Sequence, residues 1–259
     1  MTLVDEAKIP RRDRYAALAG LIGVTAVAWL YLWIDAARMA SMPGNHAGMS
    51  MTSALTVESL ALTFVMWSVM MVAMMLPSAT PAILLYQSIV AKNREAGSTL
   101  PSTGIFAAGY LTTWTAFSLA AAILHAALQA IGFLTPMMVS ASAWLSGGIL
   151  ILAGTYQWLP LKEACLLKCQ APLPFLLFHW RPGSVGTFRL GALHGLFCVG
   201  CCWALMLLLF TAGVMNLLWV ALISGFVFVE KLLPSGKLVG RLAGIGLILA
   251  GAVLIAGRL

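Results

Sequence analysis

The sequence is short of charged residues, and it has few acidic ones in particular. Only 9% of its 259 residues are Asp, Glu, Lys or Arg, whereas a typical soluble domain has about 25%. Hydrophobic residues make up 61% of the chain, and the mean hydropathy is +0.97. These values exclude an ordinary soluble protein and predict an integral membrane protein whose main partner is the lipid bilayer.

Motifs of several enzyme classes are also missing. The sequence contains no Gly-x-Ser-x-Gly elbow, no phosphate-binding loop and no His-Glu-x-x-His, which are typical of hydrolases, nucleotide-binding enzymes and zinc proteases. It has no basic stretch with interleaved aromatic residues, so the net charge of +7 does not indicate nucleic-acid binding. We therefore assign no catalytic residue.

Long apolar runs define the expected architecture. Each is close to the roughly 17–25 residues that a helix needs to cross a bilayer, and the alternation typical of a barrel strand is missing. The sequence predicts an all-α helical bundle in one membrane domain, 1–259, with seven spans, or six as the alternative. After Pro77 and Pro81, the segment 78–91 either extends the second span with a kink or lies along the interface. The expected spans lie near 15–34, 58–77, 105–127, 139–158, 189–211, 214–233 and 238–257.

Basic residues predict the orientation. With these spans, thirteen of the fifteen Lys and Arg residues fall on one side of the membrane, and only Arg38 and Arg258 fall on the other. Because cytoplasmic loops carry the excess of positive charge, the N-terminus is expected in the cytoplasm of a bacterium, with the chain in its inner membrane. The first apolar run is longer than that of a typical signal peptide, so we expect it to be retained as an anchor. The thirteen residues are Lys8, Arg11, Arg12, Arg14, Lys92, Arg94, Lys162, Lys168, Arg181, Arg189, Lys231, Lys237 and Arg241.

Cysteine is confined to one part of the chain, and three of the five cysteines lie in an apolar run beside a histidine. In a helix, His194, Cys198 and Cys202 share one stripe, with Cys201 next to it. Thiols and imidazoles bind soft transition metals. The alternative is that the cysteines pack as small apolar residues and that His194 only forms a hydrogen bond.

Methionines in the second span offer partner ligands at a comparable depth. Met66, Met70 and Met74 share one helical stripe, and Met71 and Met75 share the next. Thioethers and thiolates suit Cu(I), so copper, with zinc as the alternative, is the metal expected between the second and fifth helices. Methionine is also a flexible space filler, and core packing is the competing interpretation.

Two further groups of soft ligands lie on either side of these spans. The outer loop carries Met39 and, as a predicted metal-collecting group, Met42, His46, Met49 and Met51. The longest cytoplasmic loop carries Cys165 and Cys169, which share one face if the segment is helical. We expect the outer loop to collect the ion and the two cysteines to receive or release it.

Other polar residues in apolar surroundings have simpler explanations. His125 has no ligand at helical spacing and is expected to be a buried hydrogen-bonding partner, and His179 is expected at the interface. Glu230 and Lys231, near the inner end of the sixth span, are either an ion-pair anchor or a proton acceptor, and we favour the anchor because the lysine can reach the interface.

These segments together resemble a bacterial family of integral membrane proteins of unknown function that are labelled as predicted metal-binding. The resemblance covers roughly residues 58–257 and implies metal binding, but it assigns neither a metal nor a reaction. It rests on Met66–Ser78, Gly109–Trp114, Tyr156–Lys162 with Cys165 and Cys169, His194–Trp203, Gly213–Asn216 and Glu230–Lys231.

Three functions remain open from the sequence. The first is copper binding for transport or for delivery to a membrane metalloenzyme, with that enzyme or a metallochaperone as partner. The second is a quinone-linked membrane thiol oxidoreductase that uses Cys198 and Cys201 as a Cys-x-x-Cys pair. The third is a non-catalytic scaffold subunit of a membrane complex.

Overall fold

The computed structural model describes residues 11–41, 56–95, 97, 100–134 and 142–257. Throughout these ranges the regular structure is helical and no β-strand occurs, so the all-α prediction is confirmed. The helices are α1 (Arg11–Ser41), α2 (Val57–Glu95), α3 (Thr103–Ala130), α4 (Ala143–Tyr156), α5 (Pro160–Gln170), α6 (Pro172–Phe178), α7 (Gly183–Met206), α8 (Leu209–Ala212), α9 (Leu217–Leu232) and α10 (Gly236–Ala256).

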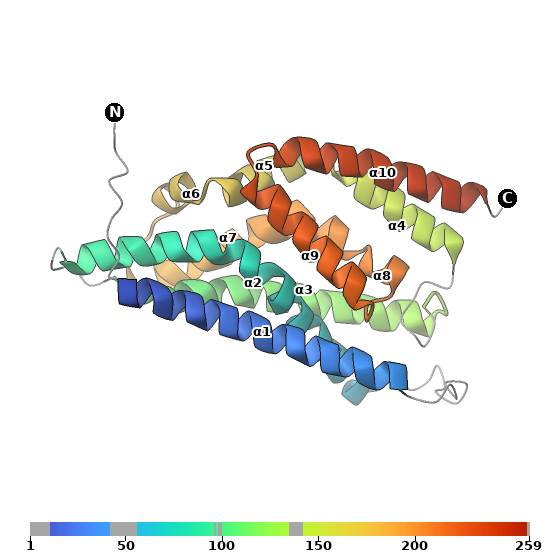
Figure 1. The fold of residues 1–259 in the computed structure, drawn as a ribbon, viewed down its shortest axis with the longest axis horizontal. Helices are drawn as coiled ribbons and strands as arrows, with labels where there is room; N and C mark the ends of the chain where they lie inside the picture. Colours follow the sequence, from blue (N-terminus) through green and yellow to red (C-terminus); the bar gives the residue numbers. More distant parts are fainter. Residues whose placement is uncertain (1–10, 42–55, 96, 98–99, 135–141, 258–259) are drawn as a thin grey trace.

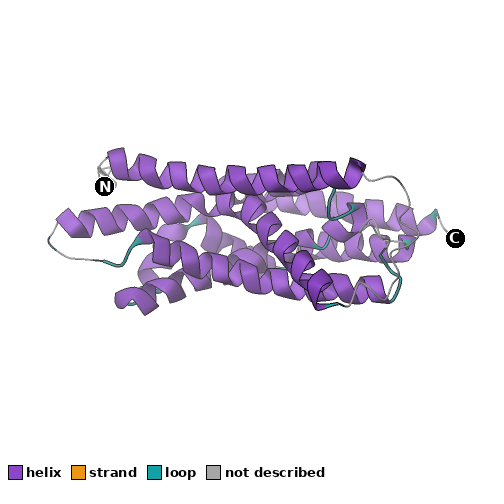
Figure 2. Ribbon diagram, turned by 90° about the horizontal axis from the view of Figure 1, so that it is seen from below, coloured by secondary structure: helices purple, strands orange, loops and turns teal. Residues whose placement is uncertain are grey.

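The helices form an elongated bundle in which most axes follow the long dimension (Figure 1). Helix α2 packs against α1, α3 and α9, while α3 pairs with α7 and α4 pairs with α10. Helix α1 lies along one side of the bundle (Figure 2), and the short helix α5 lies against α7. The core therefore lies where α2, α3, α7 and α9 come together.

Five helical segments are long and apolar enough to cross a membrane, by length and composition, within the part of the chain that the structure describes. The expected spans 139–158 and 214–233 correspond to α4, with 14 residues, and α9, with 16 residues. Both are shorter than the roughly 20 residues that a span needs. A count of seven spans thus stays a prediction. The five segments are Arg14–Arg38, Val57–Arg94, Thr103–Ala130, Gly183–Ala212 and Gly236–Ala256.

Helix α2 continues through Pro77 and Pro81 as one helix of 39 residues. Proline has no N–H, so Pro77 removes the helical donor to the Ala73 carbonyl, and Trp29 Nε1 of α1 donates to that carbonyl at 3.2 Å.

The next two carbonyls of α2 also accept side-chain donors. Ser224 Oγ of α9 donates to the Met74 carbonyl at 3.2 Å, and Tyr110 Oη of α3 donates to the Met75 carbonyl at 3.1 Å. Three neighbouring helices therefore stabilise α2 where its own ladder is weakest.

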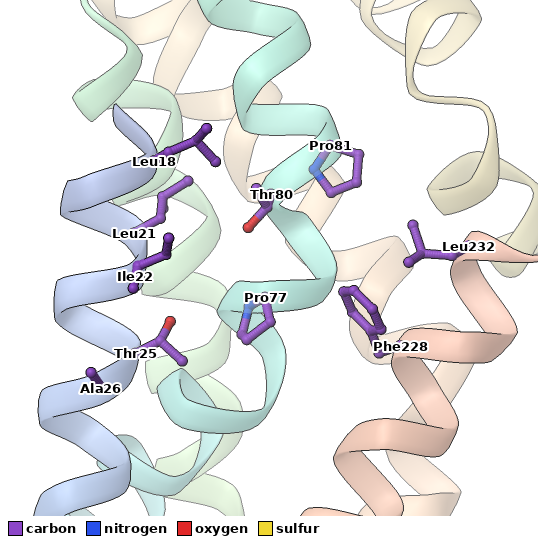
Figure 3. A pocket seen from close by; sticks show the side chains of 10 residues that line it. All are labelled: Leu18, Leu21, Ile22, Thr25, Ala26, Pro77, Thr80, Pro81, Phe228 and Leu232. Atoms are coloured by element: carbon purple, nitrogen blue, oxygen red, sulfur yellow. The ribbon is translucent and has the colours of Figure 1, made fainter. Parts of the chain in front are cut away.

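An apolar pocket of about 530 Å³ lies beside the two prolines, between α1, α2 and α9 (Figure 3). Leu21, Pro77, Pro81 and Phe228 are among the residues that line it, and its only polar side chains are threonines. It contains no sulfur, imidazole or carboxylate, so it cannot be the metal site.

The pairing of α3 with α7 depends on glycine. A Cβ atom at Gly191 would lie 1.9 Å from the carbonyl oxygen of Phe106, and one at Gly109 would lie 2.0 Å from that of Phe188. The two backbones can therefore approach this closely only because both positions lack a side chain. Because one face of α7 packs on α3, this contact determines which faces of α7 can pack against the other core helices.

Candidate metal centre

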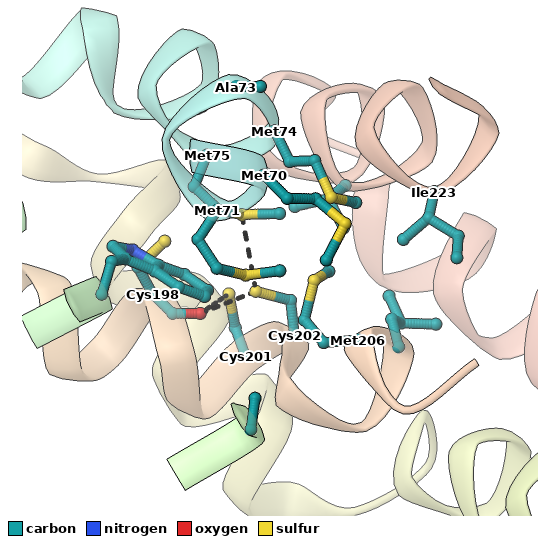
Figure 4. Packing of buried hydrophobic residues seen from close by; sticks show 14 of the residues in the cluster. Met70, Met71, Ala73, Met74, Met75, Cys198, Cys201, Cys202, Met206 and Ile223 are labelled. Atoms are coloured by element: carbon teal, nitrogen blue, oxygen red, sulfur yellow. Dashed lines mark hydrogen bonds between the residues drawn. The ribbon is translucent and has the colours of Figure 1, made fainter. Parts of the chain in front are cut away.

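Helices α2 and α7 meet through sulfur-containing side chains. The Sδ atom of Met75 lies 3.9 Å from the Sγ atom of Cys202. Figure 4 shows methionine side chains extending from α2 toward the thiols of α7, with Met206 of α7 alongside. The two helices whose contact the proposed site requires are therefore neighbours in the structure.

The sulfur cluster, as we call this group, is almost completely excluded from solvent. Its methionines and cysteines are no more than 4% exposed. The helical spacing that placed them on facing stripes therefore also places them in the core. The cluster consists of Met66, Met70, Met71, Met74 and Met75 from α2 and Cys198, Cys201 and Cys202 from α7.

The thiols of the cluster are turned toward their own helix. The Sγ atoms of Cys201 and Cys202 donate to the Cys198 carbonyl at 3.1 and 3.0 Å. Among the described residues, no three His, Cys, Asp or Glu side chains are grouped so that they could hold one ion. A metal bound here would need a thioether ligand or a rotation of these thiols.

Cys198 has two polar neighbours from other helices. Tyr110 Oη of α3 lies 3.1 Å from its Sγ atom, and Lys231 Nζ of α9 donates to that atom at 2.9 Å. Lys231 is only 6% exposed and also donates to Ser78 Oγ at 3.0 Å. The sulfur cluster thus has a buried positive charge at one edge.

The prediction that Glu230 and Lys231 form an ion-pair anchor with the lysine at the interface is wrong. The Glu230 carboxylate pairs with Lys162 Nζ of α5, which also donates to Gln157. Adjacent residues of a helix point in different directions, so Glu230 faces α5 while Lys231 faces the cluster. Lys162 is also buried, and therefore neither lysine is an exposed loop charge of the kind that the topology prediction counted.

Cys165 and Cys169 lie against the cluster rather than apart from it. Their segment is helical, which is the condition under which the two cysteines were expected to share one face, and it packs on α7. A Cβ atom at Gly200 would lie 2.7 Å from Cys165 Sγ, and Cys169 forms hydrogen bonds with Cys198 and Cys201. These bonds raise the pKa of the Cys169 thiol, while burial and then the charge of Cys201 raise the pKa of the Cys165 thiol. All five cysteines are free.

His194 lies one turn before Cys198 and is enclosed by aromatic rings. Phe175, Phe106 and Tyr110 have ring centroids 5.3, 6.1 and 5.9 Å from the imidazole. Its Nδ1 atom has no hydrogen-bond partner among the described residues. The imidazole therefore retains one unused polar atom next to the cluster.

The other two histidines of the described chain have local partners. Trp67 Nε1 donates to His125 Nδ1 at 3.4 Å, so the prediction that His125 is a buried hydrogen-bonding partner is confirmed. His179 Nδ1 lies 3.0 Å from the Phe175 carbonyl oxygen. The outer-loop ligands Met42, His46, Met49 and Met51 lie outside the described residues, and their role stays a prediction.

The fold and the sulfur cluster define an all-helical protein with soft ligands in its core. A family model described as copper chaperone, PpoB2, matches residues 64–254, and the chain belongs to this family. The match includes the whole cluster, His194, Cys165, Cys169 and Lys231. No curated protein and no solved structure gave a significant match.

The family membership confirms the prediction of a metal-related family and supports copper as the metal. It does not support the expected family of membrane proteins of unknown function, because the matching model is described by copper and not by the membrane.

Proposed function

We propose that the protein is a copper chaperone of the bacterial inner membrane that holds Cu(I) at the sulfur cluster between α2 and α7. The observation that carries this proposal is the contact between a thioether of α2 and a thiol of α7, Met75 Sδ to Cys202 Sγ at 3.9 Å. It lies within the region matched by the copper chaperone family.

The chemistry of the donors favours copper over harder ions. Thiolates and thioethers select Cu(I), whereas Mg²⁺ and Ca²⁺ need oxygen ligands. Metal binding requires the thiols to lose their protons, and Lys231 Nζ, 2.9 Å from Cys198 Sγ, would stabilise the thiolate that forms when the metal binds. Two thiolates of α7, with a thioether from Met71 or Met75, form the ligand set that we propose.

A path for the ion follows from the neighbours of the cluster. Cys169 interacts with the thiols of Cys198 and Cys201, and in this proposal copper passes from those thiols to Cys169. In this proposal the outer Met and His loop collects copper, and α5 delivers it to a metallochaperone or a membrane metalloenzyme.

Metal analysis of the purified protein tests the proposal. The wild-type protein, loaded with Cu(I) under reducing conditions in detergent, is expected to retain copper after gel filtration. Replacing both Cys198 and Cys202 by Ser should abolish retention, because Ser preserves the size of the side chain and removes the thiolate. The matched control replaces Met215, a half-buried methionine outside the cluster, by Leu. A double Ser variant that folds and retains as much copper as wild type would refute the site.

The thiol oxidoreductase alternative has one observation in its favour. Cys198 and Cys201 form a Cys-x-x-Cys pair, and a lysine beside the first thiol is typical of a reactive cysteine. Alkylation of membranes before and after reduction separates the two functions. An oxidoreductase would give a Cys198–Cys201 disulfide whose formation needs quinone, whereas a copper chaperone would give thiols that copper protects from alkylation.

A further inference from the structure

Lys231 is a buried cation without a buried anion to match it. The nearest carboxylate in sequence, Glu230, pairs with Lys162, and no carboxylate among the described residues forms a salt bridge with Lys231. Its two contacts, Ser78 Oγ at 3.0 Å and Cys198 Sγ at 2.9 Å, are a hydroxyl and a thiol. Neither is a permanent anion.

A charge in this position is costly unless something neutralises it. An ion buried in apolar surroundings loses much of its solvation, and at membrane depth such residues face a functional site or a partner. The side chain does not extend to solvent, as the 6% exposure shows. A site that acquires negative charge next to Lys231 would offset the cost.

With the two-thiolate ligand set proposed above, the charge balance of metal binding supplies that negative charge for a monovalent ion and not for a divalent one. Two thiolates with one Cu(I) carry a net charge of −1, and Lys231 brings the total to zero. Two thiolates with one Zn²⁺ carry no net charge, and Lys231 would leave a total of +1 in the core. Binding releases two thiol protons to water in both cases and transfers no electron.

We propose that Lys231 is the counter-charge of the sulfur cluster and makes it select monovalent copper over divalent zinc. This inference rests on the proposed function, since it assumes that copper binds to the α7 thiols. It assigns Lys231 no ligand role, because the ammonium group has no lone pair and acts through Cys198.

Competition titrations with wild type, Lys231→Met and Lys231→Arg test this selectivity. The Met variant keeps the length of the side chain and removes its charge, so Cu(I) affinity should fall at least about 30-fold, the lower end for removing one partner of a buried charge pair. Affinity for Zn²⁺ should hold or rise, and the Arg variant should keep most of the preference for Cu(I). The matched control is Lys237→Met, because Lys237 is 47% exposed and pairs with Glu163.

Each outcome separates this inference from the function on which it rests. If wild type binds no copper, both fail. If wild type binds copper at the α7 thiols and Lys231→Met leaves the copper-to-zinc preference unchanged, only the counter-charge is wrong. An equal loss of both metals would assign Lys231 a structural role instead.

A measurement on wild type alone covers the case in which Lys231→Met does not fold. Ag(I) and Cd²⁺ both bind sulfur but differ in charge. Wild type is expected to retain Ag(I) in preference to Cd²⁺ at equal concentrations, and equal or greater retention of Cd²⁺ would overturn the proposal.

Discussion

Two pairs of helices in this protein are joined in the same way, and only one of them borders the sulfur cluster. Helices α3 and α7 meet at Gly109 and Gly191, and α4 and α10 meet at Gly154 and Gly251. Yet 56% of the most apolar stretch of Gly183–Ala212, which includes α7, is buried, compared with 17% of the corresponding stretch of α10. Glycine brings the backbones together in both pairs, but a site also needs helices on the remaining faces, and only α7 has them.

The surroundings of the two helices explain the difference. Helix α7 has α3 on one face and α5 and the α2 side chains on the others, so its polar and sulfur groups are enclosed. Helix α10 packs mainly on α4 and leaves Leu238, Leu242 and Val253 exposed. An apolar surface of this kind suits lipid, so we interpret α4 and α10 as support for the bundle.

Breaking the α3–α7 contact should have the largest effect. In Gly191→Ala the new Cβ atom would lie 1.9 Å from a backbone oxygen of α3, so the helices must separate, at a cost of about 3 kcal/mol. We expect most Gly191→Ala molecules to lose the native fold, and we expect the variant to retain no copper. Thermal unfolding in detergent and metal analysis measure both effects. The control is Gly148→Ala, which has no atom within 4 Å of the new Cβ, and a folded variant with full copper would contradict the role of this contact.

Breaking the α4–α10 contact should lower stability but leave copper in place. A Cβ atom at Gly154 would lie 2.6 Å from the Gly244 carbonyl oxygen, and overpacking of this kind costs about 1–3 kcal/mol. The folded fraction of Gly154→Ala should therefore retain copper at the wild-type stoichiometry. Gly246→Ala, where nothing lies within 4 Å, serves as the control. Complete loss of copper from folded protein would mean that both glycine contacts hold the site.

Changing one thioether should have the smallest effect on the fold. It tests whether the metal site lies at the contact between α2 and α7. Met75→Leu keeps the volume and should alter stability by less than about 1.5 kcal/mol. It removes the sulfur atom 3.9 Å from Cys202, so we expect Cu(I) affinity to fall about tenfold, which is about 1.4 kcal/mol. Met215→Leu should leave affinity unchanged. Equal affinities of the two variants would exclude Met75 as the thioether ligand.

Helical periodicity was enough to predict which residues of each helix share a stripe, but not that the two stripes meet. The spacing grouped the α2 methionines and the α7 cysteines separately, and it grouped Cys165 with Cys169 on the condition that their segment is helical; the contact between Met75 and Cys202 comes from the structure. A period of 3.6 residues fixes these directions whatever the helix packs against.

What the sequence could not predict depends on contacts between distant segments. Helical spacing turns Glu230 and Lys231 in different directions, but it does not reveal that Lys162, 68 residues earlier, is the partner of the Glu230 carboxylate. The helices α4 and α9 are shorter than the apolar runs near 139–158 and 214–233, and the second run also contains turn residues, such as Asn216, whose N–H donates to the Gly213 carbonyl. An apolar run in the sequence shows only composition. The length of a helix depends on where its backbone hydrogen bonds end.

The hydroxyl group of Tyr110 contacts both the backbone of α2 near Pro77 and a thiol of α7. It lies 3.1 Å from both the Met75 carbonyl oxygen and Cys198 Sγ. A phenol has one hydrogen to donate, so while Cys198 is a thiol that hydrogen can go to the carbonyl. If Cys198 becomes a thiolate, the hydrogen can turn toward the sulfur, and the Met75 carbonyl then keeps Ser78 Oγ, at 2.9 Å, as its side-chain donor. Loss of the Cys198 proton would therefore change the hydrogen bonding of the α2 backbone two residues before Pro77.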